Sequence, residues 1–265
     1  MTAAAFFDLD KTIIARSSTL AFAPHLNRAG LLNKRTLLKA ALAQIYYRMF
    51  GADHDQLERI REELGDITRG WDRDQIRELI EETVEEVVSP LVYAEALFLI
   101  DDHHRNGRPV VIISSSPVEV VEPLGRHLGA DEVIGTVSEV DDAGRYTGKL
   151  VFYAYADGKA TAISEMAAER GYDLTECFAY SDSVTDLPML ELVGYPVAVN
   201  PDKDLKALAT ERNWTVLEFE RAVTIRTRLE TIPGPVPVIS GAALATAIAA
   251  GLAVWALRSR RRAVG

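Results

Sequence analysis

The run Ala3-Ala4-Ala5-Phe6-Phe7-Asp8-Leu9-Asp10-Lys11-Thr12 opens this chain of 265 residues and gives the first indication of its fold. A short apolar run that ends in acidic residues is typical of a buried parallel strand whose carboxyl end carries functional groups. At the frayed end of such a strand, Asp8 and Asp10 can both turn toward one site. Because a carboxylate is a competent nucleophile toward phosphorus, the run indicates phosphoryl chemistry as a candidate function.

Downstream of Pro90 the sequence alternates between predicted strands and predicted helices. Strands are expected at 110–113, near Val133, at 177–181 and at 196–199, and helices at 91–104, 118–128, 159–171 and 187–192. A hairpin is expected at 136–140 and 145–150, around the turn Asp141-Asp142-Ala143-Gly144. Strands that alternate with helices imply a parallel sheet covered on both faces. The predicted fold class is therefore α/β, with a Rossmann-like doubly wound parallel sheet as its core.

A long segment between the first and second predicted strands reads as helical throughout, from Arg16 to about Ser89. Within 74–88 the apolar residues recur near helical spacing, with glutamates between them. We therefore expect residues 16–89 to form an all-helical cap, inserted after the first strand of a core that comprises residues 1–15 and 90–220.

The C-terminal segment differs in composition from the rest of the chain. Three prolines stiffen a predicted linker at 221–237. Residues 238–257 follow with about twenty residues and no charge, the length that spans a bilayer core of roughly 30 Å. We expect a single transmembrane helix there, closed by a basic tail at 258–265. A buried C-terminal helix of the soluble core is the alternative.

The sequence also bears on location and oligomeric state. Arginines flank the predicted span on both sides, so its orientation stays open. Gly241, Ala245 and Ala249 have the small-residue spacing of paired helices, which raises a homodimer as one arrangement. Acidic, strand-like sequence begins as early as Asp8, so no secretory signal is expected. The main domain is therefore expected in the cytoplasm, tethered to the inner (cell) membrane.

Charge and cysteine content exclude two classes of site. The net charge of −10 argues against a nucleic-acid partner, because phosphate backbones demand a basic face. Cys177 is the only cysteine in the sequence, which excludes a disulfide within the chain and a thiolate metal site.

Further polar groups stand at the ends of other predicted strands. Ser114-Ser115-Ser116 follows the strand at 110–113 and offers hydroxyls and backbone amides to a phosphate oxygen. Lys159 opens a predicted helix, and Asp182 and Asp186 follow a later strand. Carboxylate oxygens suit Mg²⁺, which takes only a carboxylate or two and keeps several waters. Since the carboxyl ends of parallel strands meet at one edge, we expect one phosphoryl-transfer site that uses Mg²⁺.

In the order of these groups the sequence resembles the haloacid dehalogenase-like hydrolases, specifically subfamily IB and its phosphoserine phosphatase-like branch. The four motifs of that family match Asp8–Thr12, Ser114, Lys159 and Asp182–Asp186. The resemblance covers residues 3–205 and includes the cap placed between the first two motifs.

The resemblance implies a role for each matching residue. Asp8 would attack phosphorus, and Asp10 would protonate the leaving oxygen and later deprotonate the hydrolytic water. The residues expected to bind the phosphoryl group are Thr12, Ser114, Ser115 and Lys159, and those expected to hold Mg²⁺ are Asp8, Asp10 (through its carbonyl) and Asp182, with Asp186 behind them.

Three positions depart from the pattern of phosphoserine phosphatases. Ser17 stands where those enzymes carry a glutamate for the substrate ammonium. Ser114-Ser115-Ser116-Pro117 replaces a Ser-Gly-Gly run, and Ser181 replaces a glycine before the fourth motif. These changes leave the phosphate chemistry intact and put phosphoserine in doubt as the substrate. The role of His25, in the predicted cap, stays open.

The expected function is a Mg²⁺-dependent phosphomonoester hydrolase, acting through an aspartyl-phosphate on Asp8, with a small-molecule or lipid-derived phosphate as substrate. Two alternatives within catalysis are phosphoserine phosphatase proper and phosphotransfer to an acceptor other than water. An inactive membrane-tethered adaptor is the alternative from another class. The intact set of acids together with Lys159 speaks against it, because a binding module does not need all of them.

Overall fold

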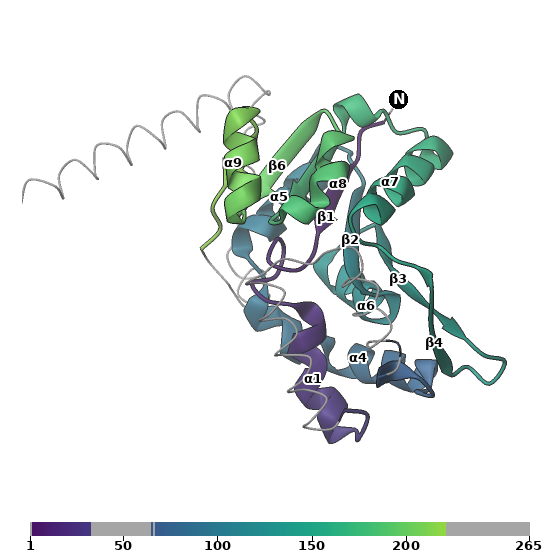
Figure 1. Cartoon of the computed structure of the whole chain (residues 1–265). Helices are drawn as coiled ribbons and strands as arrows, with labels where there is room; N and C mark the ends of the chain where they lie inside the picture. Colours follow the sequence, from purple (N-terminus) through teal and green to yellow (C-terminus); the bar gives the residue numbers. More distant parts are fainter. Residues whose placement is uncertain (1, 33–64, 66, 221–265) are drawn as a thin grey trace, which may run out of the picture. The chain divides into compact units, whose positions relative to one another are not determined.

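The run at the start of the chain supplies the central strand of a seven-stranded sheet. The computed structural model describes residues 2–32, 65 and 67–220 (Figure 1), and its sheet has the order β4-β3-β2-β1-β5-β6-β7. The strands are β1 (Ala5–Asp8), β2 (Val110–Pro117), β3 (Glu132–Val140), β4 (Tyr146–Phe152), β5 (Phe178–Ser181), β6 (Tyr195–Val199) and β7 (Thr215–Leu217). Because β1 lies in the middle of the sheet, all four of its residues are buried.

The strands of this sheet are parallel except at one edge. β1 pairs in parallel with β2 and β5, β2 with β3, β5 with β6, and β6 with β7. β4 pairs antiparallel with β3 and completes the hairpin predicted around 141–144. The predicted parallel sheet is thus confirmed, with the hairpin as its edge.

Helices cover both faces of the sheet (Figure 1). They are α1 (Ser18–Arg28), α4 (Arg73–Val88), α5 (Ala94–Arg105), α6 (Val118–Leu128), α7 (Asp157–Arg170), α8 (Leu187–Glu191) and α9 (Lys203–Glu211), with 3₁₀ turns at Ser89–Leu91, Leu174–Glu176 and Val184–Asp186. Successive side chains of β1 enter different cores: Ala5 and Phe7 pack with residues of α1, α4, α5 and α6. Phe6 packs instead with residues of α7, α8 and α9. This division confirms the doubly wound arrangement.

The segment predicted as a cap contributes α1 and α4. Phe22 of α1 and Ile80 of α4 are fully buried in the same core as α5 and α6. Within this segment, Gly70 adopts a φ of +81° and ends a helical turn. The chain then runs beside β4, where Gly70 N donates to the Tyr146 carbonyl and Tyr146 N donates to that of Trp71.

The predicted domain boundaries stay predictions. Helices expected within 33–64 lie outside the described residues. All the described residues fall within one compact unit.

In the described part of the chain, no helix combines the length and the apolar character that crossing a membrane requires. The predicted span at 238–257 lies outside the described residues, as do the predicted linker at 221–237 and the basic tail at 258–265.

Candidate active site

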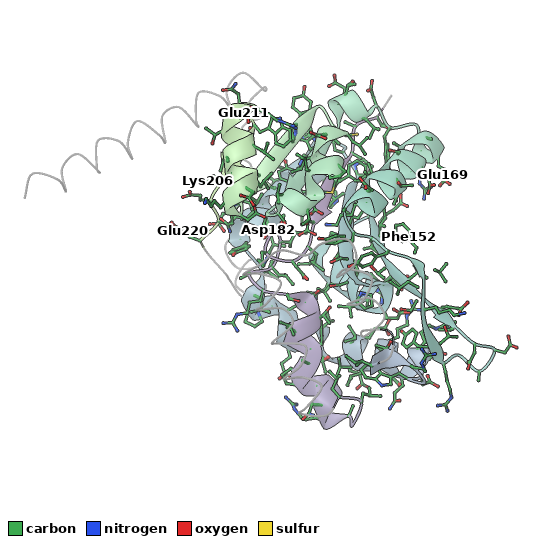
Figure 2. All side chains as sticks on the ribbon, in the orientation of Figure 1. Phe152, Glu169, Asp182, Lys206, Glu211 and Glu220 are labelled. Carbon is green, nitrogen blue, oxygen red and sulfur yellow. The ribbon has the colours of Figure 1, made fainter. Side chains whose placement is uncertain are left out.

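The carboxyl ends of β1, β2 and β5 bring the predicted residues to one edge of the sheet. Asp8 is the last residue of β1, and its register partner on β2 is Ile113, directly before Ser114. On the other side of β1, β5 ends at Ser181, directly before Asp182 (Figure 2). The parallel register therefore places three of the four predicted motifs side by side.

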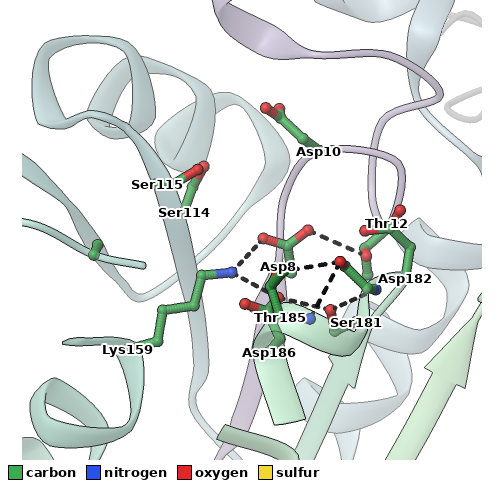
Figure 3. A network of polar contacts seen from close by, with 12 residues as sticks. Asp8, Asp10, Thr12, Ser114, Ser115, Lys159, Ser181, Asp182, Thr185 and Asp186 are labelled. Carbon is green, nitrogen blue, oxygen red and sulfur yellow. Dashed lines mark hydrogen bonds and ion pairs between the residues drawn. The ribbon is translucent and has the colours of Figure 1, made fainter. Parts of the chain in front are cut away.

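Asp8 lies at the centre of a network of polar contacts (Figure 3). Its side chain is buried, and Oδ1 accepts a hydrogen bond of 2.6 Å from Lys159 Nζ. Oδ2 accepts a hydrogen bond of 3.3 Å from Thr12 Oγ1. Burial raises the pKa of Asp8 to about 8, and the charges of Asp186 and Asp182 act in the same direction against Lys159.

Lys159 comes from the first turn of α7 and is shared between two carboxylates. Besides Asp8, its ammonium group donates to Asp186 Oδ2 at 2.8 Å. Burial alone would lower the pKa of Lys159, but Asp186 and Asp8 together raise it above its usual value. The lysine therefore stays charged. Gly158, directly before Lys159, lets the start of α7 pack closely against the Tyr153 carbonyl. A Cβ at position 158 would lie 2.1 Å from that oxygen.

Asp10 is held by the start of α1 and by the end of β2. Its Oδ1 accepts from Ser18 N at 2.8 Å, and its Oδ2 accepts from Ser116 Oγ at 3.5 Å. Burial raises the pKa of Asp10, and the hydrogen bond from Ser18 N partly offsets this rise. A carboxyl group with a raised pKa is suited to donating a proton.

Asp182 is paired with a lysine that sequence reasoning did not single out. Lys11 Nζ lies 3.3 Å from Asp182 Oδ2. Burial raises the pKa of Asp182 to about 6, although Lys11 opposes the rise. The loop after β5 is fixed by Asp202, whose N–H donates to the Asp182 carbonyl at 2.7 Å and whose Oδ2 accepts from Val184 N at 2.9 Å.

The donor set and its charge fit a divalent cation. Asp8 and Asp186 share the Lys159 ammonium group and Asp182 pairs with that of Lys11, so together with Asp10 the site holds more carboxyl groups than ammonium groups. No group of three or more His, Cys, Asp or Glu side chains in the described ranges is arranged to hold a metal ion. Mg²⁺ does not need a group of three such side chains, because it typically takes one or two carboxylates and keeps several waters. The carboxylates of Asp8 and Asp182, together with the Asp10 carbonyl, are ligands of the kind and number that Mg²⁺ takes.

The serines of β2 differ in their environments. β2 and β3 change register between Ile113 and Pro117, which places the serines at an irregularity that re-aims side chains. The Ser114 hydroxyl is buried and accepts from Ser116 N at 3.1 Å. Ser115 has an exposed side chain, and its carbonyl accepts from Thr136 Oγ1 at 2.8 Å. The serines thus lie within the strand, whereas the sequence predicted them after it.

Sequence reasoning therefore located the carboxylates, Lys159, Thr12 and Ser114 at one site, but it missed several of their partners. The missed residues are Lys11, Ser18, Ser116, Ser181 and Asp202. Ser181, which replaces the glycine of phosphoserine phosphatases, donates to Asp186 Oδ2 at 2.6 Å. His25 lies on α1, and neither of its buried ring nitrogens has a hydrogen-bond partner among the residues that the structure describes.

Comparison with known proteins places this site in a family. The sequence profile of the haloacid dehalogenase-like hydrolases matches residues 5–191. A "probable phosphatase" of Mycobacterium tuberculosis is 51% identical over 253 residues, which cover 96% of this chain and 85% of the relative. A "phosphoserine phosphatase" of the same organism is 35% identical over 265 residues, covering 99% and 82%. A "histidinol-phosphatase" of Neisseria meningitidis is 32% identical over 223 residues, covering 82% and 98%.

Solved structures agree on the fold. A Bordetella pertussis protein of unknown function has a TM-score of 0.72 at 26% identity, covering 82% of this chain and 99% of that one. A phosphoserine phosphatase solved as an analogue of its phospho-aspartyl intermediate has a TM-score of 0.59 at 16% identity, covering 88% and 99%. The chain belongs to the haloacid dehalogenase-like hydrolases. It is an enzyme of the phosphatase type and resembles the phosphoserine phosphatase branch of that family.

Proposed function

We propose that the protein is a Mg²⁺-dependent phosphomonoester hydrolase that acts through an aspartyl-phosphate on Asp8. The observation that carries this proposal is the environment of Asp8, whose two oxygens face Lys159 Nζ at 2.6 Å and Thr12 Oγ1 at 3.3 Å. A buried carboxylate with a charged lysine beside it matches what phosphoryl transfer demands, a nucleophile next to fixed positive charge. The phosphatases among its relatives support the same reaction.

The reaction then has two steps with balanced proton transfers. In the first, an Asp8 oxygen bonds to phosphorus, the bond from phosphorus to the leaving oxygen breaks, and Asp10 donates a proton to that oxygen. In the second, water attacks the phosphorus, Asp10 takes its proton, and the Asp8 carboxylate is released. Lys159, with the hydroxyls of Thr12, Ser114 and Ser115, would neutralise and orient the phosphoryl oxygens.

Mg²⁺ would be held by the Asp8 and Asp182 carboxylates and by the Asp10 carbonyl. Asp186 would stand behind them, since it already bonds Lys159 and Ser181. The cation would supply positive charge to the phosphoryl group during transfer.

The leaving group is proposed as a small molecule or a lipid-derived alcohol. The relatives above are named for two different leaving groups, serine and histidinol, so kinship alone does not choose between them. Ser17, in place of the glutamate that binds the phosphoserine ammonium, favours a leaving group without that requirement. Residues 16–89 are proposed as the cap that makes the choice, above a core of residues 1–15 and 90–220.

The tail at 238–257 is proposed as a membrane anchor, because about twenty residues without charge match the thickness of a bilayer. Membrane fractionation of cells that produce the full chain tests this, with a chain ending at residue 237 as control. Recovery of both chains in the cytosolic fraction would contradict the anchor.

A phosphate-release screen with Mg²⁺, across amino-acid, sugar, nucleotide and lysophospholipid phosphates, tests the reaction and its substrate. The Asp8→Asn protein is the blank. Turnover of at least one phosphomonoester, lost in the blank, is the expected result. Turnover that persists in Asp8→Asn, or none in the wild type, would contradict the proposed function.

A further inference from the structure

Three hydroxyl groups meet beside Asp10, at the point where α1 approaches the end of β2. Ser116 Oγ lies 2.8 Å from Ser18 Oγ and 3.1 Å from Thr19 Oγ1. It also lies 3.5 Å from Asp10 Oδ2. Ser18 is fully buried and Ser116 nearly so. We call Ser18, Thr19 and Ser116 the hydroxyl cluster.

The chemistry of the groups sets the direction of these hydrogen bonds. Once Asp10 has given up its proton, its carboxylate can only accept, so Ser116 then donates its one hydroxyl proton to Asp10. Its two lone pairs are then free to accept from Ser18 Oγ and Thr19 Oγ1. Every capacity of the Ser116 hydroxyl is used in this arrangement, as expected of a buried polar group.

The main chain of Ser116 is fixed as well. Its N–H donates to the Ser114 hydroxyl at 3.1 Å, which ties Ser116 to the residue expected to bind phosphate. Asp10 is held from its other side, because Oδ1 accepts from Ser18 N at 2.8 Å. One oxygen of the Asp10 carboxylate is therefore bonded by α1 and the other by β2.

We propose that Ser116 is a positioning residue, which aims the Asp10 carboxyl at the leaving oxygen, and that Ser18 and Thr19 hold Ser116 in place. Through this cluster, the start of α1 sets the geometry of proton donation. The inference rests on the proposed function, in which Asp10 is the general acid. It adds three hydroxyls that the family motifs do not include.

The test compares two substrates that differ in their need for a proton. The phenol released from phenyl phosphate has a pKa near that of tyrosine, about 10, so its departure depends on the acid. The p-nitrophenol released from p-nitrophenyl phosphate is far more acidic and leaves without that help. The shapes of the two esters are close, so changes in binding affect both alike.

Ser116→Ala should lower kcat/KM for phenyl phosphate by about tenfold or more, out of the 10²–10⁴ that acid catalysis typically supplies. For p-nitrophenyl phosphate the fall should stay below about threefold, since that step needs no acid. Ser116→Thr keeps the hydroxyl and should recover most of the phenyl phosphate activity. The matched control is Ser164→Ala, which removes an exposed hydroxyl bonded to the Ala160 carbonyl of its own helix.

Ser18→Ala is a second test variant if Ser116→Ala does not fold, because it removes a hydroxyl of the cluster and keeps the N–H bond to Asp10. It should show the same selective loss with phenyl phosphate, at a smaller size. Equal losses on both substrates, or no loss on either, would overturn the role of Ser116 while leaving the proposed function intact. A wild-type protein that hydrolyses neither ester would overturn the proposed function, and the inference with it.

Discussion

The ammonium group of Lys159 lies 2.6 Å from the Asp8 carboxylate, and their side chains are only 3% and 9% exposed. Asp186 is 2.8 Å from the same ammonium group, so one buried cation serves two buried anions. Such an arrangement is asymmetric, because the loss of the cation leaves two charges without a partner. The loss of one anion leaves a balanced pair.

This asymmetry predicts unequal effects of two substitutions on stability. Lys159→Met should lower the free energy of unfolding by about 3–5 kcal/mol, the usual effect of leaving a buried charge unpaired. Asp8→Asn should change it by less than about 1 kcal/mol or raise it, because burial already disfavours the charged Asp8. Urea unfolding at pH 7 measures both.

Lys206→Met is the control for this pair, since Lys206 makes an exposed ion pair of 3.6 Å with Glu218. It should have an effect below about 1 kcal/mol. A loss for Asp8→Asn as large as that for Lys159→Met would contradict the asymmetry.

Ser181 and Asp186 should be energetically coupled. Their hydrogen bond is 2.6 Å long and fully buried, and a hydrogen bond to a charged group typically contributes about 1.5–3 kcal/mol. In a double-mutant cycle, Ser181→Ala should destabilise the wild type by roughly that amount and the Asp186→Asn protein by clearly less. Equal losses in the two backgrounds would contradict the coupling.

Mg²⁺ should stabilise the folded protein even without substrate, because it relieves the excess negative charge around Asp182. A ligand present at about 100 times its Kd stabilises by about 2.7 kcal/mol. The melting temperature should therefore rise with Mg²⁺ concentration in the wild type and stay constant in Asp182→Asn. Asp204→Asn, which changes an exposed carboxylate at the start of α9, should behave as the wild type does. A shift that survives in Asp182→Asn would place the cation elsewhere.

His103 should make stability depend on pH. It is buried between Tyr180, whose hydroxyl lies 2.9 Å from Nε2, and Arg108, whose Nε donates to Nδ1 at 2.7 Å. Burial, helped by Arg108, lowers the pKa of His103 from 6.5 to about 3. Between these values the unfolded chain binds a proton that the folded chain does not, so stability falls as the pH drops through the window.

The contribution of His103 to the slope of the unfolding free energy against pH approaches about 1.4 kcal/mol per pH unit. His103→Gln should reduce the measured slope of unfolding free energy between pH 4.5 and 6.5 by up to that amount, with His104→Gln, an exposed neighbour on α5, as the matched control. Identical slopes in the wild type and His103→Gln would mean that folding leaves the pKa of His103 unchanged, and would contradict this prediction.

The position of a site residue could be predicted from the sequence where a single physical rule determines it. The carboxyl ends of parallel strands lie on the same side of a sheet, so the sequence alone predicts that Asp8, Ser114 and Asp182 lie together. The irregularity in β2 could not be predicted, because it depends on how Pro117 pairs with Thr136 in a distant strand. The partners Ser18 and Ser116 escaped for the same reason, since 98 residues separate them and no local pattern links them.

Short elements near the end of the described part were also missed. α9 and β7 have nine and three residues, too few for a clear period. Asp202 was a readable signal, because it precedes α9 as an N-cap and accepts from Asp204 N and Leu205 N. Its second contact, with Val184 in the loop after β5, is a tertiary one.

The most direct test of Asp8 as nucleophile is chemical trapping of its phosphorylated form. Asp10→Asn should form this intermediate from p-nitrophenyl phosphate, which needs no acid, and should hydrolyse it slowly because the general base is missing. After an acid quench, borohydride reduction converts an aspartyl-phosphate to homoserine, and peptide mass spectrometry locates it. We predict homoserine at position 8, dependent on substrate and Mg²⁺ and absent from Asp8→Asn. Homoserine at another position, or p-nitrophenol release by Asp8→Asn at the wild-type rate, would contradict the proposed mechanism.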